Sequence, residues 1–235
     1  MAVDAALLAW AVRTHPQRPV LRLYSWARPT LSLGVHQRVS DELVTRCAEH
    51  NVDVVRRPTG GTAVLHGGDL TYSVVAPTAG RGVLEAYSWV AEGLIAGLEL
   101  LGIPAEAGSR GTGPSGAPAL DSRSACFATT VGADLKVRGS KICGSAQVRR
   151  SGWFLQHGSI PVADGRPLTA DLLRHPGRND STCIDLIRPG TTTGELAGAL
   201  IDGFESRWGR FREVKIEKFS PGNREVKPSS ELILA

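Results

Sequence analysis

The longest regular pattern in the chain restricts the fold most. Residues 83–101 carry apolar side chains at helical spacing. We expect a helix there that ends at Gly102, because glycine often follows the last helical residue. Short runs of β-branched or alternating residues lie on both sides of it. Strands that precede, separate and follow helices predict an α/β or α+β protein with a mixed sheet.

Other segments give weaker signals of the same kinds. Ser40 is a suitable N-cap for a helix through about His50. Residues 63–66 and 70–76 are predicted to form a hairpin around Gly67-Gly68. The Gly/Pro/Ser loop 108–118 is expected to be mobile, and the tail from Ser220 is expected to be loose. Further helices are predicted at 2–13, 168–174 and 193–208, and further strands at 20–24, 30–35, 52–56, 125–131, 135–137, 141–149, 154–162 and 213–219.

Length and charge set broad limits on function. The chain has 235 residues and a formal net charge of +4, which suits one large domain, alone or with a small appendage. It lacks the Lys/Arg block of a nucleic-acid binder, so the mild basicity favours either solubility or an acidic protein partner. The apolar start carries Asp4 and no basic region, which predicts a helix rather than a signal peptide. No apolar run reaches the length of a membrane span, about 18 residues or more.

The cysteines indicate a reduced protein with one or more reactive candidates. Cys47, Cys126, Cys143 and Cys183 form no CxxC pair, which argues against a zinc site or a disulfide framework and favours a cytoplasmic protein. A nucleophilic thiol needs a nearby cation, because the thiolate is the reactive form. Lys141 lies near Cys126 and Cys143 in sequence, and spacing does not choose between them. For either cysteine the alternative is an inert, buried thiol.

Two segments place polar and glycine residues within strand-like sequence. The first is RRPTGGTAVLH at 56–66, where Arg56 and Arg57 precede a Gly-Gly turn. The turn allows close approach of a ligand to backbone N–H groups, and the arginines can bind a phosphate or carboxylate in forked geometry. Composition alone favours the alternative, an ordinary hairpin turn with solvated arginines.

The second segment is GSKICGSAQVRRSGWFLQHGSI at 139–160. Lys141, Gln147 and His157 lie within or beside strands rich in small residues, which leave room for a ligand against the backbone. A partly desolvated lysine in such a strand is a candidate functional amine. The alternative is a lysine whose ammonium group extends to solvent.

These two segments, with LTYSV at 70–74 and SACF at 124–127, resemble the lipoate–protein ligase and octanoyltransferase family from about residue 3 to residue 215. The resemblance implies a single α/β (α+β) domain of the biotin/lipoate ligase type over residues 1–215, followed by a tail at 216–235. Its central sheet should be mixed, largely antiparallel and flanked by helices. The PTGGTA loop differs from the GRGRxG-type loop of biotin ligases, and TGGTAV differs from the SGGGAV common in ATP-dependent lipoate ligases.

Within this superfamily the better match is the cysteine-dependent octanoyltransferase. That branch has its acyl-thioester cysteine in a Cys-Phe pair, matching Cys126-Phe127, and a lysine that lowers the thiol pKa fifteen residues later, matching Lys141. The resemblance thus selects Cys126 over Cys143. It implies that octanoyl passes from octanoyl-acyl carrier protein, through a Cys126 thioester, to a lysine of an apo lipoyl-type carrier. That carrier would be the glycine cleavage H protein or a lipoyl domain.

The resemblance also implies the remaining parts of the site. No ATP, metal or redox cofactor is expected, because the incoming thioester is already activated. Lys141 would stabilise the thiolate and move protons, and backbone N–H groups near Gly144 would hold the oxyanion. We predict substrate contacts from Arg57, Thr59, Gly60, Gly61, His66, Gly144, Ser145, Gln147 and His157.

The chain departs from the family pattern at its start. The family has a strand ahead of the first helix and an Asp-Glu pair where this chain has Asp4-Ala5. Either the start is truncated or this edge of the sheet is built differently. Three alternative functions remain: an ATP-dependent ligase in which Lys141 holds an acyl-adenylate, an amidotransferase between carrier proteins, and a non-catalytic protein that binds acylated carriers.

Overall fold

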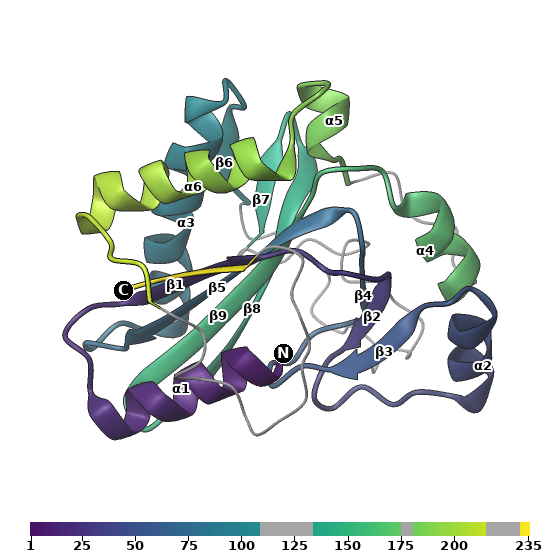
Figure 1. Cartoon of the computed structure of the whole chain (residues 1–235), viewed down its shortest axis with the longest axis horizontal. Coiled ribbons are helices and arrows are strands. Elements are labelled where there is room, and N and C mark those ends of the chain that lie inside the picture. The colour runs from purple at the N-terminus through teal and green to yellow at the C-terminus, as the bar shows by residue number, and fades with distance from the viewer. Residues whose placement is uncertain (109–133, 175–180, 215–230) are drawn as a thin grey trace, which may run out of the picture.

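The computed structural model describes residues 1–108, 134–174, 181–214 and 231–235 (Figure 1). The expected strand at 125–131 and almost all of the 108–118 loop lie outside these residues. The elements in chain order are α1 Ala2–Thr14, β1 Val20–Tyr24, β2 Thr30–Leu33, α2 Asp41–Glu49, β3 Asp53–Arg56, β4 Val64–His66, β5 Asp69–Pro77, α3 Val83–Leu100, β6 Ala105–Ala107, β7 Leu135–Val137, β8 Ser140–Arg150, β9 Trp153–Pro161, α4 Arg166–Leu173, α5 Ile184–Ile187, α6 Thr193–Trp208 and β10 Glu231–Leu234.

Most elements follow the predicted pattern. At two helix starts, the side chain that caps the helix is visible in the structure. The Ser40 side chain accepts a hydrogen bond from Leu43 N–H and begins α2. Thr192 and Glu195 form a reciprocal capping box at the start of α6. The short elements β6 and α5 were not predicted, whereas the equally short β4 and β7 were.

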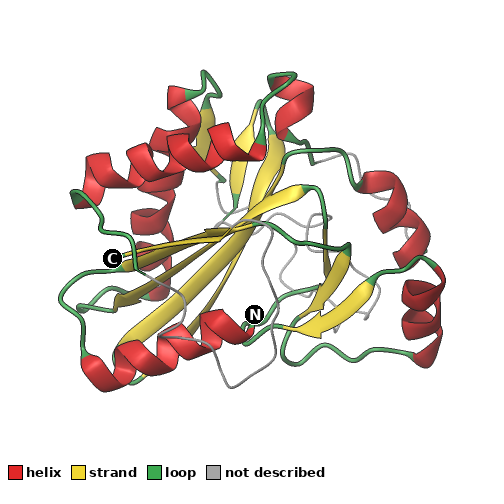
Figure 2. Ribbon diagram, in the orientation of Figure 1, coloured by secondary structure: helices red, strands yellow, loops and turns green. Residues whose placement is uncertain are grey.

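A large antiparallel sheet forms the centre of the molecule (Figure 2). Its strand order is β10-β1-β5-β9-β8-β7-β6, and each neighbouring pair is antiparallel. A second sheet of order β3-β2-β4 contains one parallel and one antiparallel pair. The expected mixed, largely antiparallel architecture flanked by helices is therefore confirmed.

One face of the large sheet packs against α3 and α6. Tyr72, Val74 and Ala76 alternate along β5 and join the same apolar cluster as residues of both helices. The helices approach closely because they meet through glycine. A Cβ on Gly203 would lie 2.2 Å from the backbone nitrogen of Gly97. The α3–α6 layer thus covers this face with an apolar core.

The opposite face of the large sheet packs against α1 and is partly polar. Val20, Val75 and Leu155 pack there with apolar residues of α1. Further along the same strands, the side chains on this face are polar. Arg22 pairs in register with Ser73, and Ser73 with His157. The candidate site lies on this polar part of the face. Hydroxyl and imidazole side chains fill less of the space above the sheet than leucine side chains would.

The small sheet corrects one prediction. Residues Val64–His66 and Asp69–Pro77 do not form a hairpin around Gly67-Gly68. The first pairs with β2 in the small sheet and the second with β1 and β9 in the large one. Gly67 has a φ of +140°, and a Cβ there would lie 3.1 Å from Pro29 Cα, so the turn that leads from one sheet to the other requires glycine.

The end of the chain corrects a second prediction. The sequence predicts a loose tail from Ser220; residues 220–230 lie outside the described part, but Glu231–Leu234 forms the edge strand β10 beside β1. Val214 N–H donates to Ile233 O, and Arg212 and Ala235 exchange backbone hydrogen bonds. Of the predicted strand at 213–219, residues 215–219 lie outside the described part, and Glu213 makes an isolated bridge to Leu234. The edge next to β1 is therefore built from the C-terminal end of the chain.

Across the described ranges, no helix is both long enough and apolar enough to cross a lipid bilayer.

Candidate functional site

The Asp4 carboxylate from α1 lies at the centre of the first polar cluster. It is fully buried and pairs with Arg22 of β1. Its oxygens accept hydrogen bonds from Tyr24 Oη at 3.2 Å and Ser73 Oγ at 2.9 Å. His157 Nδ1 lies 3.0 Å from Asp4 Oδ2. The other buried residues of α1 are apolar. The helix thus places one buried carboxylate against side chains of three strands, β1, β5 and β9.

Electrostatics define the protonation of this cluster. Burial alone would raise the pKa of Asp4, but Arg22 and the hydrogen bond from His157 lower it far below its ordinary value. Burial also lowers the pKa of His157, against the opposing effect of Asp4. An ionised Asp4 beside a neutral imidazole requires His157 Nδ1–H to be the donor. His157 Nε2 then accepts from Thr59 Oγ1, 2.6 Å away.

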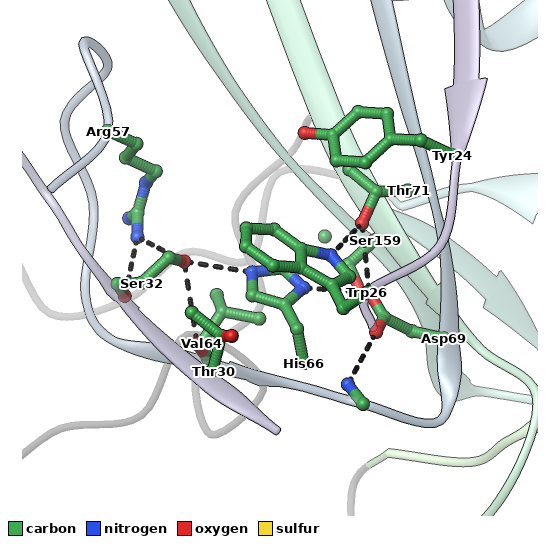
Figure 3. A network of polar contacts seen from close by, with 12 residues as sticks. Tyr24, Trp26, Thr30, Ser32, Arg57, Val64, His66, Asp69, Thr71 and Ser159 are labelled. Carbon is green, nitrogen blue, oxygen red and sulfur yellow. Dashed lines mark hydrogen bonds and ion pairs between the residues drawn. The ribbon is translucent and has the colours of Figure 1, made fainter. Parts of the chain in front are cut away.

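A second buried carboxylate, Asp69 at the start of β5, organises a parallel cluster (Figure 3). Its Oδ2 atom lies 2.7 Å from His66 Nδ1, 3.0 Å from Thr71 Oγ1 and 2.6 Å from Ser159 Oγ. Its Oδ1 atom accepts from Gly67 N–H at 3.0 Å. The other imidazole nitrogen, His66 Nε2, lies 2.9 Å from Ser32 Oγ.

The surroundings hold the Asp69 cluster in one arrangement. Trp26 stacks on the His66 ring with centroids 4.3 Å apart, and its Nε1–H donates to Thr71 Oγ1 (Figure 3). Burial alone would raise the pKa of Asp69, but the neighbouring His66 ring and hydrogen bonds from His66, Ser159 and Gly67 lower it below its ordinary value. Asp69 is therefore an ionised acceptor for every donor around it.

Arg57 organises the loop between β3 and β4. Its guanidinium donates to Ser32 O, Gly60 O and Thr62 O, and its Nη1 atom lies 3.3 Å from Ser32 Oγ. Arg56 donates in the same way to carbonyls of residues 34, 35 and 37. Arg57 is buried and does not match the solvated hairpin interpretation, whereas Arg56 is exposed, as that interpretation expects. The contacts of Arg57 favour a role in shaping the Gly60-Gly61 turn, and direct anion binding by either arginine stays a prediction.

A pocket opens between the two sheets where the clusters meet. Its cavity volume is about 30 Å³, room for a few water molecules and well below the volume of small-ligand sites, about 300–1,000 Å³. Five predicted contact residues line it: Arg57, His66, Gly144, Ser145 and His157. The other lining residues are Met1, Ser32, Val64, Thr71, Ala146, Gly158 and Ser159.

The remaining predicted contact residues lie around this pocket without lining it. Thr59 is fully buried behind His157. Gly60 accepts from Arg57, and Gly61 has a φ of +93° that suits glycine. Gln147 bonds Gln156 through its amide nitrogen, 3.0 Å from Gln156 Oε1. The structure thus brings five of the nine predicted residues to the wall of one cavity. The other four lie outside its lining.

Lys141 is a buried ammonium at the start of β8. Its side chain is 1% exposed, and Nζ lies 2.9 Å from Oδ2 of the equally buried Asp134. This excludes the alternative in which the lysine extends to solvent. Lys141 precedes Gly144 by three residues on the same strand, roughly 10 Å along it. An ammonium group buried at this depth interacts strongly with neighbouring charged groups, because the local dielectric constant is low.

The described cysteines are poor nucleophile candidates. Cys143 is fully buried, and Cys47 and Cys183 are nearly so. Burial also raises the pKa of Cys47, which disfavours its thiolate. Cys126 lies outside the described residues, so its role stays a prediction.

Sequence reasoning missed both carboxylates that organise the site. Asp4 stands in an otherwise apolar helix face, and Asp69 begins a strand in which Thr71 and Ser73 alternate with apolar residues. An acid at an inward position of an apolar pattern is the signal that could have identified them, because charged groups are buried only when paired.

Gly158 gives a direct test of the pocket wall. An added Cβ would lie 2.5 Å from Gly144 O and 2.6 Å from the Tyr72 ring. We expect Gly158→Ala to destabilise the fold by about 1–3 kcal/mol through overpacking and to narrow the pocket. Urea unfolding measures the loss of stability, and ligand affinity measures the narrowing of the pocket. Gly165→Ala is the matched control, since a Cβ there meets open space at negative φ; equal stability of the two variants would contradict the packing described.

Comparison with known sequences places the chain in a family. The family model of the lipoyl protein ligase A/B catalytic domain matches residues 1–182. The chain is 45% identical over 167 residues to an octanoyltransferase LipM of Carboxydothermus hydrogenoformans, covering 69% of this chain and 60% of that protein. It is 36% identical over 241 residues to an octanoyltransferase LipM of Halalkalibacterium halodurans, covering 94% and 84%. The chain thus spans about three fifths of the first relative's length.

Comparison of structures agrees on the fold. A crystal structure of lipoate-protein ligase A bound with ATP superposes with a TM-score of 0.74 at 24% sequence identity, covering 92% of this chain and 84% of that one. At this identity the likeness concerns the fold alone. With the family model spanning most of the chain and the LipM proteins matching at this level, the chain belongs to the lipoyl protein ligase A/B catalytic domain family.

Proposed function

We propose that this chain is an octanoyltransferase of protein lipoylation. It takes octanoyl from octanoyl-acyl carrier protein onto Cys126 as a thioester, and passes it to a lysine of an apo lipoyl-type carrier. The acceptor is the glycine cleavage H protein or a lipoyl domain. The LipM relatives support the reaction class, and the mild positive charge suits acidic carrier partners.

The buried Lys141 carries the proposal among the structural observations. A family member that only bound acylated carriers would have no need for an ammonium desolvated beside Asp134. A thiolate nucleophile needs such a cation, since an opposite charge nearby favours the charged form of the thiol. The burial of the other three cysteines leaves Cys126 as the candidate partner of Lys141.

Small residues at the pocket wall support acyl transfer in a second way. Gly144, Ser145 and Gly158 form a wall of small residues against which an acyl chain can lie. Backbone N–H groups near Gly144 are the proposed oxyanion donors. Because a thioester is already activated, the reaction needs no ATP.

Mass spectrometry of the intact chain tests the proposal. Incubation with octanoyl-acyl carrier protein, without ATP, should add one octanoyl group that hydroxylamine removes. Cys126→Ala should abolish the adduct, whereas Cys143→Ala, the matched control at a buried thiol, should retain it. Absence of an adduct under single-turnover conditions, or carrier modification that requires ATP and persists in Cys126→Ser, would overturn the mechanism and favour a ligase.

A further inference from the structure

The pocket between the two sheets is too small for the ligand that the proposed function requires. Its cavity volume is about 30 Å³, whereas small-ligand sites have about 300–1,000 Å³. A few water molecules fit in such a space, but an octanoyl chain needs more room. Binding of the acyl group here therefore requires the walls of the pocket to separate.

The small sheet forms one body with α2 and α4, which lie beside it on the right of Figure 1. The apolar core of this small-sheet body is separate from the two apolar cores of the large sheet. It consists of Leu31, Leu33, Leu43, Cys47, Val52, Ala63, Leu172 and Leu173. Among the described elements, no strand or helix of this body packs broadly on one of the large sheet. Separation of the two parts would therefore leave each described apolar core intact.

Three connections between the small-sheet body and the large sheet lie side by side at one end of the pocket. The turn at Gly67-Gly68 joins β4 to β5, and Pro29 is the last residue of the segment that joins β1 to β2. A Cβ on Gly67 would lie 3.1 Å from Pro29 Cα. Gly68 O accepts from the N–H groups of Val162 and Ala163, in the segment that joins β9 to α4. Adjacent connections of this kind can act together as a hinge, because hinges consist of a few residues in loops or at the ends of elements.

A hydrogen bond joins the two parts at the other end of the pocket. Pro161 ends β9 at the hinge, and His157 lies four residues before it, about 13 Å along the strand. Strand β3 runs parallel to β2 and away from the hinge, and Thr59 lies in the loop that follows β3. Thr59 Oγ1 is 2.6 Å from His157 Nε2, and both side chains are buried. The hinge and this hydrogen bond therefore lie at opposite ends of the pocket.

We propose that the small-sheet body opens about this hinge to admit the acyl group, and that the Thr59–His157 hydrogen bond holds it closed. The inference rests on the proposed function for the identity of the ligand. The motion itself belongs to the chain without ligand, so it can be measured without an acyl donor.

The walls of the pocket suit such a motion because many of their side chains are polar. Ser32 and His66 line the pocket from the small sheet, and Thr71 and Ser159 line it from the large sheet. Water can hydrate these groups when the walls separate, so that opening does not leave them without hydrogen-bond partners. An apolar interface would instead resist separation in proportion to the area exposed. The contact of His66 with Asp69 spans the hinge turn itself, where the separation is smallest.

Thiol labelling of the isolated chain tests the inference. Val64 lines the pocket from β4, and Val64→Cys places a thiol there that iodoacetamide reaches only when the walls separate. In this background, Thr59→Val should raise the alkylation rate of the introduced thiol about 5- to 100-fold. The change removes the Thr59 partner of His157 Nε2 in the closed form, whereas water takes that place in the open form. Peptide mapping distinguishes the introduced thiol from the native cysteines.

Two controls separate opening from loss of structure. Thr191→Val removes another buried hydroxyl, one that donates to Arg188 O and does not line the pocket, and it should leave the alkylation rate unchanged. Cys47 lies in the apolar core of the small-sheet body. It should stay protected in Thr59→Val, because opening as one body does not expose it, whereas local unfolding of that body would.

An unchanged alkylation rate in Thr59→Val would overturn the role of the hydrogen bond. Parallel gains at the introduced thiol and at Cys47 would show local unfolding and overturn opening as one body. Reaction of the introduced thiol as fast as a free cysteine, with Thr59 in place, would show that the closed form is not populated. If Val64→Cys does not fold, Ala146→Cys places the reporter thiol on the β8 wall of the same pocket. Because the labelling uses no acyl donor, its outcome is independent of the octanoyl-adduct test of the proposed function.

Discussion

Replacing Lys141 with methionine should destabilise the fold by about 3–5 kcal/mol, because Asp134 would remain buried without its ammonium partner. Methionine keeps most of the side-chain volume, so the loss reports charge rather than a cavity. Lys141→Met/Asp134→Asn should recover most of the stability, since removing both charges removes the imbalance. Urea unfolding of the wild type, both single variants and the double variant measures this coupling.

The same variant should change the chemistry of Cys126 under the proposed mechanism. Loss of a nearby cation should raise the midpoint of thiol alkylation by roughly one pH unit. Peptide mapping would assign the alkylated site. Lys136→Met is the matched control, because Lys136 pairs in register with Lys141 from β7 but is only partly buried. An unchanged alkylation profile in Lys141→Met would show that Lys141 does not tune the thiol.

Replacing Asp4 with asparagine should also cost about 3–5 kcal/mol at neutral pH. The change removes the carboxylate that pairs with Arg22 and accepts from Tyr24, Ser73 and His157. Because α1 carries Asp4 and β9 carries His157, the loss should loosen the packing of the helix on the sheet. Urea unfolding at pH 7 measures the change.

The pH dependence of stability gives the Asp4 prediction a second readout. The folded state lowers the pKa of Asp4 below the ordinary value of about 3.9. Its contribution is therefore fully present above that value and is lost as the pH falls toward the folded pKa. Wild-type stability should decline below about pH 5, and Asp4→Asn should decline less steeply. Asp69 adds to the decline in both proteins, because its pKa is also lowered.

Asp164→Asn is the control for this series. The pKa of Asp164 is also lowered, chiefly by its hydrogen bond with Arg166, but both side chains are more than a third exposed. We expect a change of about 0–1 kcal/mol, as for other surface ion pairs. If Asp4→Asn is as mild as Asp164→Asn, the Asp4 cluster does not hold α1 to the sheet.

Local patterns predicted most elements of the fold. The helices α3 and α6 and the strand β1 follow the predicted residues closely, because each has a clear period or a recognisable cap. The hairpin at Gly67-Gly68 was wrong for a physical reason. Two adjacent strands joined by glycines satisfy the local pattern of a hairpin, yet each pairs with a strand far away in sequence. Strand β10 was missed because its partners are likewise distant.

The predicted site was partly recovered for a similar reason. The motifs identified His66, Ser145 and His157, and the structure brings these to one pocket. The motifs did not identify Asp4 or Asp69. Each carboxylate acts through residues on other strands, and only strand register reveals those partners.

The sequence by itself determined the residue types that the chemistry requires: the thiol of Cys126, the amine of Lys141, and the imidazoles of His66 and His157. It also determined the α/β class through the period of its apolar residues. Tertiary structure alone decided the surroundings of the amine and of the two imidazoles. It buried Lys141 beside Asp134, paired each imidazole with its own carboxylate, and directed only His66 to a hydroxyl on the pocket wall. These are properties of burial and distance between strands, and no local pattern encodes them.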